Sequence, residues 1–365
     1  MVNQLWPACV MIAVAAFSEG CRAPEQAAWT VKFSHVYAAN TDYQRMAERF
    51  RDLMAERTGG RFRVTIYPSG QLGDERVAFE QLQFGAQHMA ISGTPVLSGW
   101  VPEGQIFDLP FLFGTREEGV AALNGTLGTW WRALLLEKTG VRSLGFLEYG
   151  FRHVYNRKHP IETPDDLKGL KLRVLQNTTY LRAYDAYGVQ ATPMAYGEVY
   201  SALQQGVVDG GEANVIGYMT DRFYEVAPYF SFTSITYNPI TLLINDAFYR
   251  SLPPGVRAAV DQSAAEALAF QTEVSLNMTA EAIRDMKAAG VTISRPRLDA
   301  FARIVRPAVW NGLAGRLHDG QRLLEWVQRE TTRLQSINRT SEEARLWAWQ
   351  TPARLGRVRQ DRGGL

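Results

Sequence analysis

The sequence predicts an α/β protein of two domains, and three patterns support this prediction. Apolar strands alternate with amphipathic helices between residues 41 and 91, and the alternation starts again near residue 170. Residues 230–244 form an extended run too long for an average strand, which suits a hinge strand passing between two domains. Residues 255–289 form a helical pattern without proline, far longer than an average helix and long enough to span both domains.

The first half of the chain marks where its elements start and end. Thr41 is expected to cap a helix whose apolar residues recur every three or four positions until a glycine pair ends it at residues 59–60. Alternating residues predict a strand at 62–66, and a helix at 74–84 leads to a short apolar strand at 89–91. A strand, a helix and a strand in this order predict parallel pairing with right-handed crossovers.

The second half repeats the pattern. A strand is expected at residues 170–174, helices at 180–187 and 198–205, and a further strand at 207–208. The tail after Arg339 is rich in arginine, ends in glycines and has little to bury. We therefore expect the tail to be disordered.

Composition excludes several classes of function. The 365 residues are 46% hydrophobic and 21% charged, which is typical of a soluble globular protein, and a net charge of +2 argues against a nucleic-acid partner. Both cysteines, Cys9 and Cys21, lie near the N-terminus. The body of the chain from Arg22 onward therefore cannot form disulfides, thiolate metal sites or a cysteine nucleophile.

An apolar, uncharged run at residues 5–17 predicts a secretion leader over residues 1–28. The run is too short to span a bilayer comfortably and suits the core of a signal peptide. Cys21 follows a sequence similar to a degraded lipoprotein signal, so a lipid anchor at Cys21 is one alternative. Cleavage near Ala23 or Ala28 is a second. A buried first helix is a third, although the run has no polar face.

Arg173 is the strongest candidate for ligand binding. Leu170, Leu172 and Val174 share one face of their strand, so Arg173 points the other way, near the C-terminal end. Open α/β sheets bind ligands at that end, and the planar guanidinium matches a carboxylate with two parallel hydrogen bonds. The alternative is an arginine paired with a neighbouring acid.

Arg152 and Glu212 are the other charged candidates. Arg152 precedes the Pro-Asp-Asp-Leu-Lys-Gly turn that leads to Arg173, and Glu212 follows the strand expected at residues 207–208. Both are therefore expected near the crevice of Arg173. The alternative for Glu212 is an ion pair that orients one of the two arginines.

Other reactive groups in the sequence give little indication of a catalytic or metal site. The five histidines show no metal-ligand spacing, and only His35, in the first loop, is placed to face a cleft. A nucleophile-elbow motif and a phosphate-binding loop are both missing from the sequence. No cofactor is expected.

Five separated motifs give the chain a specific resemblance. They are YPSGQLGD at residues 67–74, GFR at 150–152, PDDLKGLKLRV at 164–174, ATPM at 191–194 and EVYSALQQGVVDG at 198–210. In this order they resemble the substrate-binding subunits of tripartite ATP-independent periplasmic (TRAP) transporters, the DctP-type family, over about residues 29–334. The resemblance implies a type II-like periplasmic-binding fold, with hinge strands and a long domain-spanning helix. It also implies a solute receptor, not an enzyme, that delivers a small organic acid to a membrane permease driven by an ion gradient.

The resemblance also implies roles for single residues. The arginine matching Arg173 holds the solute carboxylate in the family, and the arginine matching Arg152 adds a second contact in many members. In another branch, the glutamate matching Glu212 helps to hold a cation. Asn238, within the extended run at residues 230–244, and His35 are also predicted to contact the solute.

Two positions depart from the sialic-acid-binding branch. Ala213 stands where that branch has asparagine, and Ser92-Gly93 replace its acidic residue. Sialic acid is therefore not the expected solute, although Ala213, Ser92 and Gly93 remain expected at the cleft.

The implied organisation has two discontinuous domains. We predict domain I at residues 29–150 and 239–278, domain II at 151–238 and 279–310, a C-terminal helical segment at 311–338 and a tail at 339–365. A periplasmic monomer is expected. The alternatives are an enzyme on a similar two-lobed scaffold, for which the sequence offers no nucleophile or metal cluster, and a receptor that feeds a sensor protein.

Overall fold

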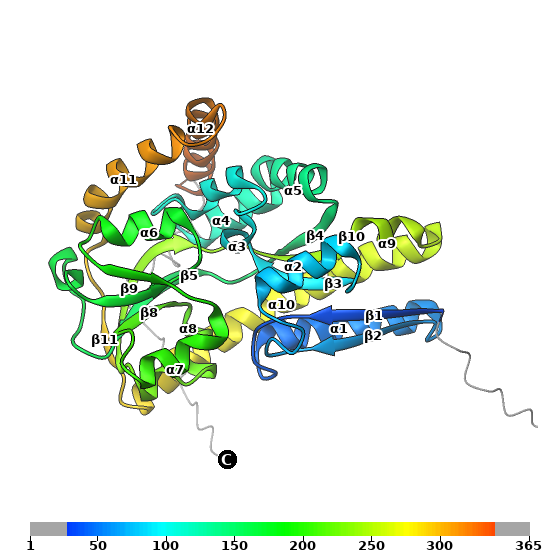
Figure 1. Cartoon of the computed structure of the whole chain (residues 1–365), viewed down its shortest axis with the longest axis horizontal. Helices are drawn as coiled ribbons and strands as arrows, with labels where there is room; N and C mark the ends of the chain where they lie inside the picture. The colour runs from blue at the N-terminus through cyan, green and yellow to red at the C-terminus, as the bar shows by residue number, and fades with distance from the viewer. Residues whose placement is uncertain (1–27, 340–365) are drawn as a thin grey trace, which may run out of the picture.

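A computed structural model of the chain describes residues 28–339, which form two β-sheets surrounded by helices (Figure 1). The α/β fold class is therefore confirmed. The leader with Cys21, and the tail beyond Arg339, lie outside the described residues. No helix among residues 28–339 combines the length and the apolar character needed to cross a membrane.

The first sheet has five strands in the order β2-β1-β3-β10-β4. The strands are β1 (Trp29–Ser34), β2 (Phe62–Tyr67), β3 (Met89–Gly93), β4 (Val141–Leu147) and β10 (Ile240–Asn245). β1 pairs in parallel with both β2 and β3, which confirms the predicted parallel pairing in this half. β10 lies antiparallel between β3 and β4, so a late segment of the chain returns to complete the early sheet.

Side-chain caps position the helices beside this sheet, and the one at Thr41 was predicted. Thr41 accepts a hydrogen bond from the Gln44 amide and begins α1 (Asp42–Thr58), and Gly59, with φ +60°, ends it. Asp74 caps α2 (Glu75–Phe84) through the Val77 amide. The first lobe also contains α3 (Thr94–Leu97), η1 (Pro102–Asp108), α4 (Arg116–Asn124), α5 (Thr126–Thr139) and α9 (Asp246–Ser251).

The second sheet has six strands in the order β11-β9-β5-β8-β6-β7. The strands are β5 (Phe151–Asn156), β6 (Lys171–Val174), β7 (Gln190–Pro193), β8 (Gly210–Ala213), β9 (Tyr229–Tyr237) and β11 (Thr292–Ser294). The predicted strand at residues 207–208 is wrong, because Val207 is 53% exposed and the strand begins at Gly210. The helices of this lobe are α6 (Thr178–Asp185), α7 (Val199–Gln204) and α8 (Val215–Thr220), with short turns η2 (Pro164–Leu167), η3 (Tyr196–Glu198) and η4 (Phe223–Glu225).

Two of the places where the chain crosses between the sheets are adjacent. The chain leaves β4 and enters β5 through residues 148–150, and it leaves β9 and enters β10 through residues 238–239. The Asn238 amide donates to the Gly150 carbonyl at 3.1 Å, so the two crossings are bonded to each other. Residues 151–156, the first segment of the predicted domain II, form β5 within the second sheet. The crossings support the predicted domain boundaries and hinge, which remain predictions.

The long helix is confirmed as α10 (Pro254–Ala288), whose 35 residues correspond to about 52 Å of helix. It contacts α1 and β4 of the first lobe and α8 of the second (Figure 1). Near its middle, Gln271 donates from Nε2 to the Glu148 carbonyl at 2.8 Å and accepts from the Glu148 amide at 2.9 Å. The helix therefore binds the first crossing directly.

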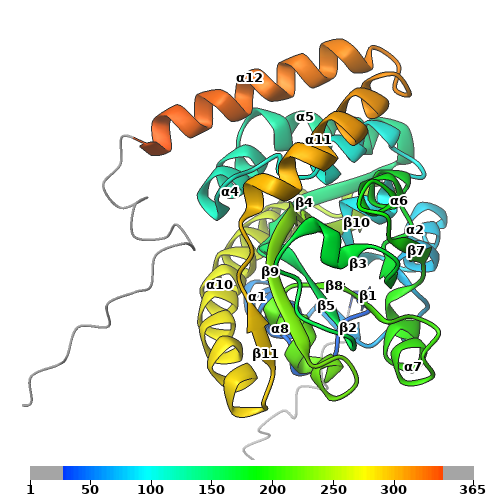
Figure 2. The ribbon, with the colours of Figure 1, turned by 90° about the vertical axis from the view of Figure 1, so that its left-hand side faces the viewer.

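The C-terminal helices α11 (Leu298–Ala314) and α12 (Gly320–Arg339) lie across one side of the molecule, above α4 and α5 (Figure 2). One hydrophobic cluster contains Trp131 of α5, Tyr184 of α6 and Phe301 of α11. Apolar packing therefore joins helices of both lobes on this side.

Candidate functional site

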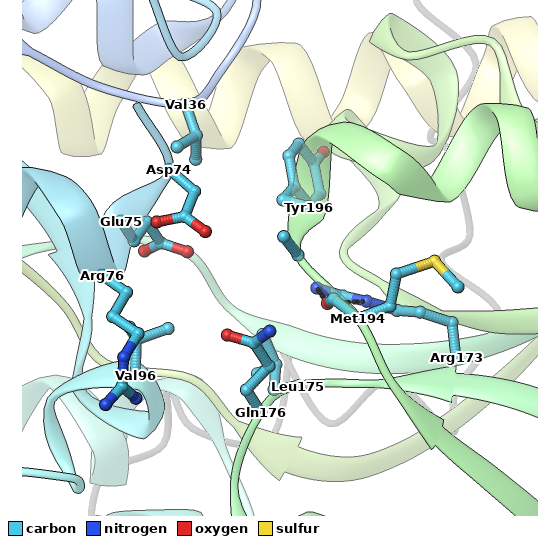
Figure 3. A pocket seen from close by; sticks show the side chains of 11 residues that line it. Val36, Asp74, Glu75, Arg76, Val96, Arg173, Leu175, Gln176, Met194 and Tyr196 are labelled. Atoms are coloured by element: carbon cyan, nitrogen blue, oxygen red, sulfur yellow. Dashed lines mark hydrogen bonds between the residues drawn. The ribbon is translucent and has the colours of Figure 1, made fainter. Parts of the chain in front are cut away.

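A cavity lies between the two sheets and has two adjoining parts, whose space, open solvent included, is about 290 and 300 Å³. Side chains from both lobes line it (Figure 3). The first part is lined by Val36, Asp74, Glu75, Arg76, Val96, Arg173, Leu175, Gln176, Met194, Ala195 and Tyr196. The second shares Glu75, Val96, Leu175 and Tyr196 with the first and adds Tyr37, Gly93, Pro95, Tyr149, Arg152, Asn238 and Ile240.

Arg173 occupies the predicted position near the end of β6 and extends into the cavity (Figure 3). It is 2% exposed, and its Nε and Nη2 donate to the Met194 carbonyl at 3.0 and 2.8 Å. Among residues 28–339, Nη1 has no hydrogen-bond acceptor and the guanidinium has no ion pair. Burial, followed by the charge of Arg152, lowers the pKa of Arg173, as expected for a cation without an anion.

Arg152 lies beside Arg173 but already has an acidic partner. Its Nε lies 3.2 Å from Oε1 of Glu212, and its Nη2 donates to the Glu212 carbonyl at 2.7 Å. Nη1 donates to the Tyr149 hydroxyl at 2.8 Å. This is the ion-pair alternative that the sequence left open for Glu212. The guanidinium of Arg152 lines the second part of the cavity, with its charge largely neutralised.

Glu212 lies within β8 and does not line the cavity. Its second carboxylate oxygen accepts from the Tyr184 hydroxyl at 3.2 Å. Burial raises the pKa of Glu212, against the opposing charges of Arg152 and Arg173. Residues 28–339 contain no cluster of three or more acidic, histidine or cysteine side chains suited to a metal ion.

The remaining predicted site residues divide into two groups. Gly93 and Asn238 line the second part of the cavity. Ser92, Ala213 and His35 are buried and are not among the lining residues. His35 instead places Nε2 at 2.9 Å from the Gln44 side chain.

Glu75 lines both parts of the cavity and was missed by the sequence reasoning. It faces Arg173 from the opposite lobe (Figure 3), and its Oε1 accepts from the Gly93 amide at 2.7 Å. Burial raises the pKa of Glu75, against the bond from Gly93 and the charge of Arg173. In the sequence, Glu75 is notable only because it follows the cap Asp74. An acidic residue at the start of a helix is ordinarily explained by its favourable interaction with the helix dipole.

Three tyrosines of the cavity wall also lay outside the sequence prediction. The ring of Tyr37 lies 5.8 Å from that of Tyr196, and Tyr149 faces the Arg152 guanidinium at 5.1 Å. Tyr196 lies 5.9 Å from the Arg173 guanidinium carbon. These rings come from separate segments of the chain and approach one another only in the folded structure. The sequence alone therefore gives no sign that they share a cavity wall.

Two α/β lobes joined by adjacent crossings, with a buried guanidinium in the cavity between them, define a solute-binding protein of the periplasmic-binding type. The chain belongs to the bacterial extracellular solute-binding protein family 7 (DctP), whose family model matches residues 33–313. The resemblance to TRAP solute-binding subunits is thereby confirmed. The protein is a solute receptor of this transport family.

Relatives and solved structures agree with this assignment. The chain is 32% identical over 268 residues to the 2,3-diketo-L-gulonate-binding periplasmic protein YiaO of Escherichia coli, with 73% of this chain and 81% of that protein covered. It is similar to a TRAP periplasmic solute-binding protein from Sulfitobacter sp. NAS-14.1 with bound β-D-galacturonate, at 26% identity and a TM-score of 0.80, covering 82% and 99% of the two chains. A Chromohalobacter salexigens homologue with bound D-glucuronate has 31% identity and a TM-score of 0.79, covering 83% and 99%.

Proposed function

We propose that this receptor binds a sugar acid, a monocarboxylate with several hydroxyl groups, in the cavity between its lobes. The observation that carries the proposal is the charge arrangement. Glu212 neutralises Arg152, whereas Arg173 has no ion pair among residues 28–339, and Glu75 adds an acceptor opposite it. One unpaired cation facing an acidic group suits one carboxylate with hydroxyls better than two carboxylates.

The polar neighbours of Arg173 provide partners for hydroxyl groups. The Glu75 carboxylate accepts hydrogen bonds, and the amides of Gln176 and Asn238 both donate and accept. The tyrosine rings add flat amphipathic walls, which a sugar ring can contact with its C–H faces. Relatives with bound uronates support this assignment, since their solutes carry one carboxylate and several hydroxyls.

The transport mechanism follows from binding shared between two lobes. A solute that contacts Arg173 from one lobe and Glu75 from the other stabilises the closed form over the open one. The closed receptor then delivers its cargo to a TRAP permease driven by an ion gradient. We propose that the chain acts as a periplasmic monomer without catalytic activity. Among the described residues, no serine, threonine, cysteine, lysine or histidine lines the cavity, and no cluster of side chains is suited to a metal ion.

A thermal-shift panel tests this function. D-glucuronate, D-galacturonate and D-erythronate are compared with succinate and with D-glucose, which lack the hydroxyl groups and the carboxylate respectively. A sugar acid at about 100 times its Kd is expected to stabilise the fold by about 2.7 kcal/mol, while succinate and D-glucose leave it unchanged. Stabilisation by succinate alone would contradict the sugar-acid assignment and leave the solute-receptor role intact.

A further inference from the structure

Tyr196 links the two parts of the cavity, because it lines both. Its ring lies 5.9 Å from the Arg173 guanidinium carbon and 5.8 Å from the ring of Tyr37 on the other lobe. The residue begins the short turn η3, followed by exposed Gly197 and Glu198. The turn alone therefore gives the side chain little support.

The hydroxyl of Tyr196 is held by Asp221, which does not itself line the cavity. The hydroxyl donates to Oδ2 of Asp221, in the turn after α8. The Asp221 amide donates to the Gly217 carbonyl at 3.0 Å, which fixes this turn on α8. A Cβ at Gly217 would lie 3.2 Å from the Tyr196 hydroxyl and 3.0 Å from Oδ1 of Asn214, so the glycine leaves room for the contact.

We propose that Asp221 is a positioning residue for solute binding, which holds the Tyr196 ring against Arg173 so that the cavity wall is in place before the solute arrives. The inference rests on the proposed function of the cavity. A wall fixed in advance lowers the conformational entropy that binding must remove. Removing Asp221 therefore weakens binding although Asp221 does not touch the solute.

The strength of the contact depends on the charge of Asp221. A carboxylate accepts a stronger hydrogen bond than a neutral carboxyl group does. Burial raises the pKa of Asp221 to about 6, against the opposing bond from Tyr196. Above pH 6 the group is ionised and holds the ring. As the pH falls through about 6, the carboxylate of Asp221 gains a proton and its hydrogen bond with Tyr196 weakens.

The other titratable groups around this turn are engaged elsewhere. Arg222 pairs with Glu225 at 3.0 Å, and the Tyr200 hydroxyl of α7 donates to the same carboxylate at 3.0 Å. The Tyr218 hydroxyl of α8 donates to the Ala227 carbonyl at 2.9 Å. Asp221 therefore acts on the cavity through Tyr196. Glu75 also titrates inside the cavity, so the comparison must be made between variants and not on one pH curve.

The test is a double-mutant cycle in Kd, measured by calorimetry between about pH 5 and pH 8. The probe is the tightest binder among D-glucuronate, D-galacturonate and D-erythronate. At about pH 7.5 we expect Asp221→Asn to weaken binding about three- to tenfold, and the double variant with Tyr196→Phe to bind no worse than Tyr196→Phe alone. The loss caused by Asp221→Asn should shrink as the pH falls below about 6.

Asp261→Asn is the matched control, because Asp261 accepts from the Tyr249 hydroxyl at 2.7 Å away from the cavity. Its Kd should equal that of the unmodified protein. The role of Asp221 would be overturned if the losses of binding free energy from Asp221→Asn and Tyr196→Phe simply added in the double variant. An unchanged Kd for Asp221→Asn at about pH 7.5 would also overturn it. Failure of the unmodified protein to bind any of the three acids would instead overturn the proposed function, and with it this inference.

Discussion

The Glu212 carboxylate lies 3.2 Å from Nε of Arg152, and both side chains are almost wholly withdrawn from solvent, with exposures of 1% and 3%. The pair places one neutralised guanidinium beside that of Arg173, which has no ion pair within residues 28–339. Burying two charges is costly unless each satisfies the other. We therefore expect Glu212 to act on solute binding through Arg152, without contacting the solute.

Replacing Glu212 by glutamine tests the cost of leaving Arg152 without its counter-charge. The expected loss is about 3–5 kcal/mol of unfolding free energy, because a buried cation would remain unpaired. Urea denaturation measures this loss. Glu225→Gln serves as the control, since it removes a surface partner of Arg222 and should cost less than about 1 kcal/mol. Equal stabilities for the two variants would contradict the structural role of the pair.

Asn177 provides a contact between the lobes that can be separated from its helix cap. Its Oδ1 accepts from the Thr179 amide at 2.7 Å, while its Nδ2 donates to Oδ2 of Asp108 at 2.8 Å and to the Pro95 carbonyl at 3.1 Å. Asn177→Ser keeps a good cap and removes the contact with the other lobe. We expect this variant to bind sugar acids about three- to thirtyfold more weakly, because the closed form loses these bonds.

Asn245→Ser is the matched control for Asn177→Ser. Asn245 caps α9 through the Phe248 amide, and its Nδ2 donates to the Leu82 carbonyl within the first lobe. Calorimetry should show normal solute affinity for this variant. Equal effects of the two substitutions would mean that Asn177 contributes stability and not closure.

Hinge closure is tested by small-angle scattering with and without solute. The crossings at residues 148–150 and 238–239 are short enough for a few dihedral angles to absorb a rotation. The radius of gyration should decrease when a saturating sugar acid is added. An unchanged radius would contradict closure about these crossings.

Glu75 should set the preference between one and two carboxylates. Glu75→Gln removes the negative charge facing Arg173 while keeping a hydrogen-bond acceptor of similar shape. We expect the ratio of the Kd for D-glucuronate to the Kd for a dicarboxylic sugar acid to rise about tenfold, because repulsion of the second carboxylate is relieved. An unchanged ratio in competition binding would show that Glu75 does not select by charge.

Asp42 should make the stability of the fold depend on pH. It is 0% exposed, and burial raises its pKa from 3.8 to about 6, against a bond from Gln271. The folded state therefore binds the proton more tightly, so stability falls as the pH rises from about 4 to about 6. Asp42→Asn avoids this loss. Between about pH 4 and pH 6 its free energy of unfolding should rise by up to about 3 kcal/mol relative to that of the unmodified protein.

Urea unfolding at several pH values measures the gain of Asp42→Asn. Asp52→Asn, on an exposed part of the same helix, is the control and should follow the unmodified protein throughout. Parallel stability curves for Asp42→Asn and the unmodified protein would show that the buried carboxyl imposes no such cost.

Much of the fold could be predicted because its signals are local. The cap at Thr41 and the long helix need only neighbouring residues to be recognised. β8 was missed because its glycines indicate a turn. A Cβ at Gly210 would lie 2.0 Å from the Tyr155 carbonyl, so the glycine serves a close approach of two strands that no local pattern reveals.

Those site residues could be predicted whose side-chain direction follows from the alternation of residues along a strand. Arg173 could be placed at the end of β6 by alternation and family resemblance, and it lines the cavity. The sequence could not decide whether Glu212 faces a solute or pairs with Arg152, since both lie within the same crevice by spacing. Glu75 and Tyr196 enter the cavity through the arrangement of separate elements.

The most direct test of the central claim is calorimetry of Arg173→Ala with the preferred sugar acid. We expect the variant to fold normally and to lose about 2–5 kcal/mol of binding free energy, because Arg173 contributes a buried guanidinium that has no ion pair in the described part of the chain. Arg173→Lys should also bind poorly, since an ammonium group cannot reproduce the planar fork. Near-normal affinity in Arg173→Ala would contradict the assignment of Arg173 as the carboxylate anchor.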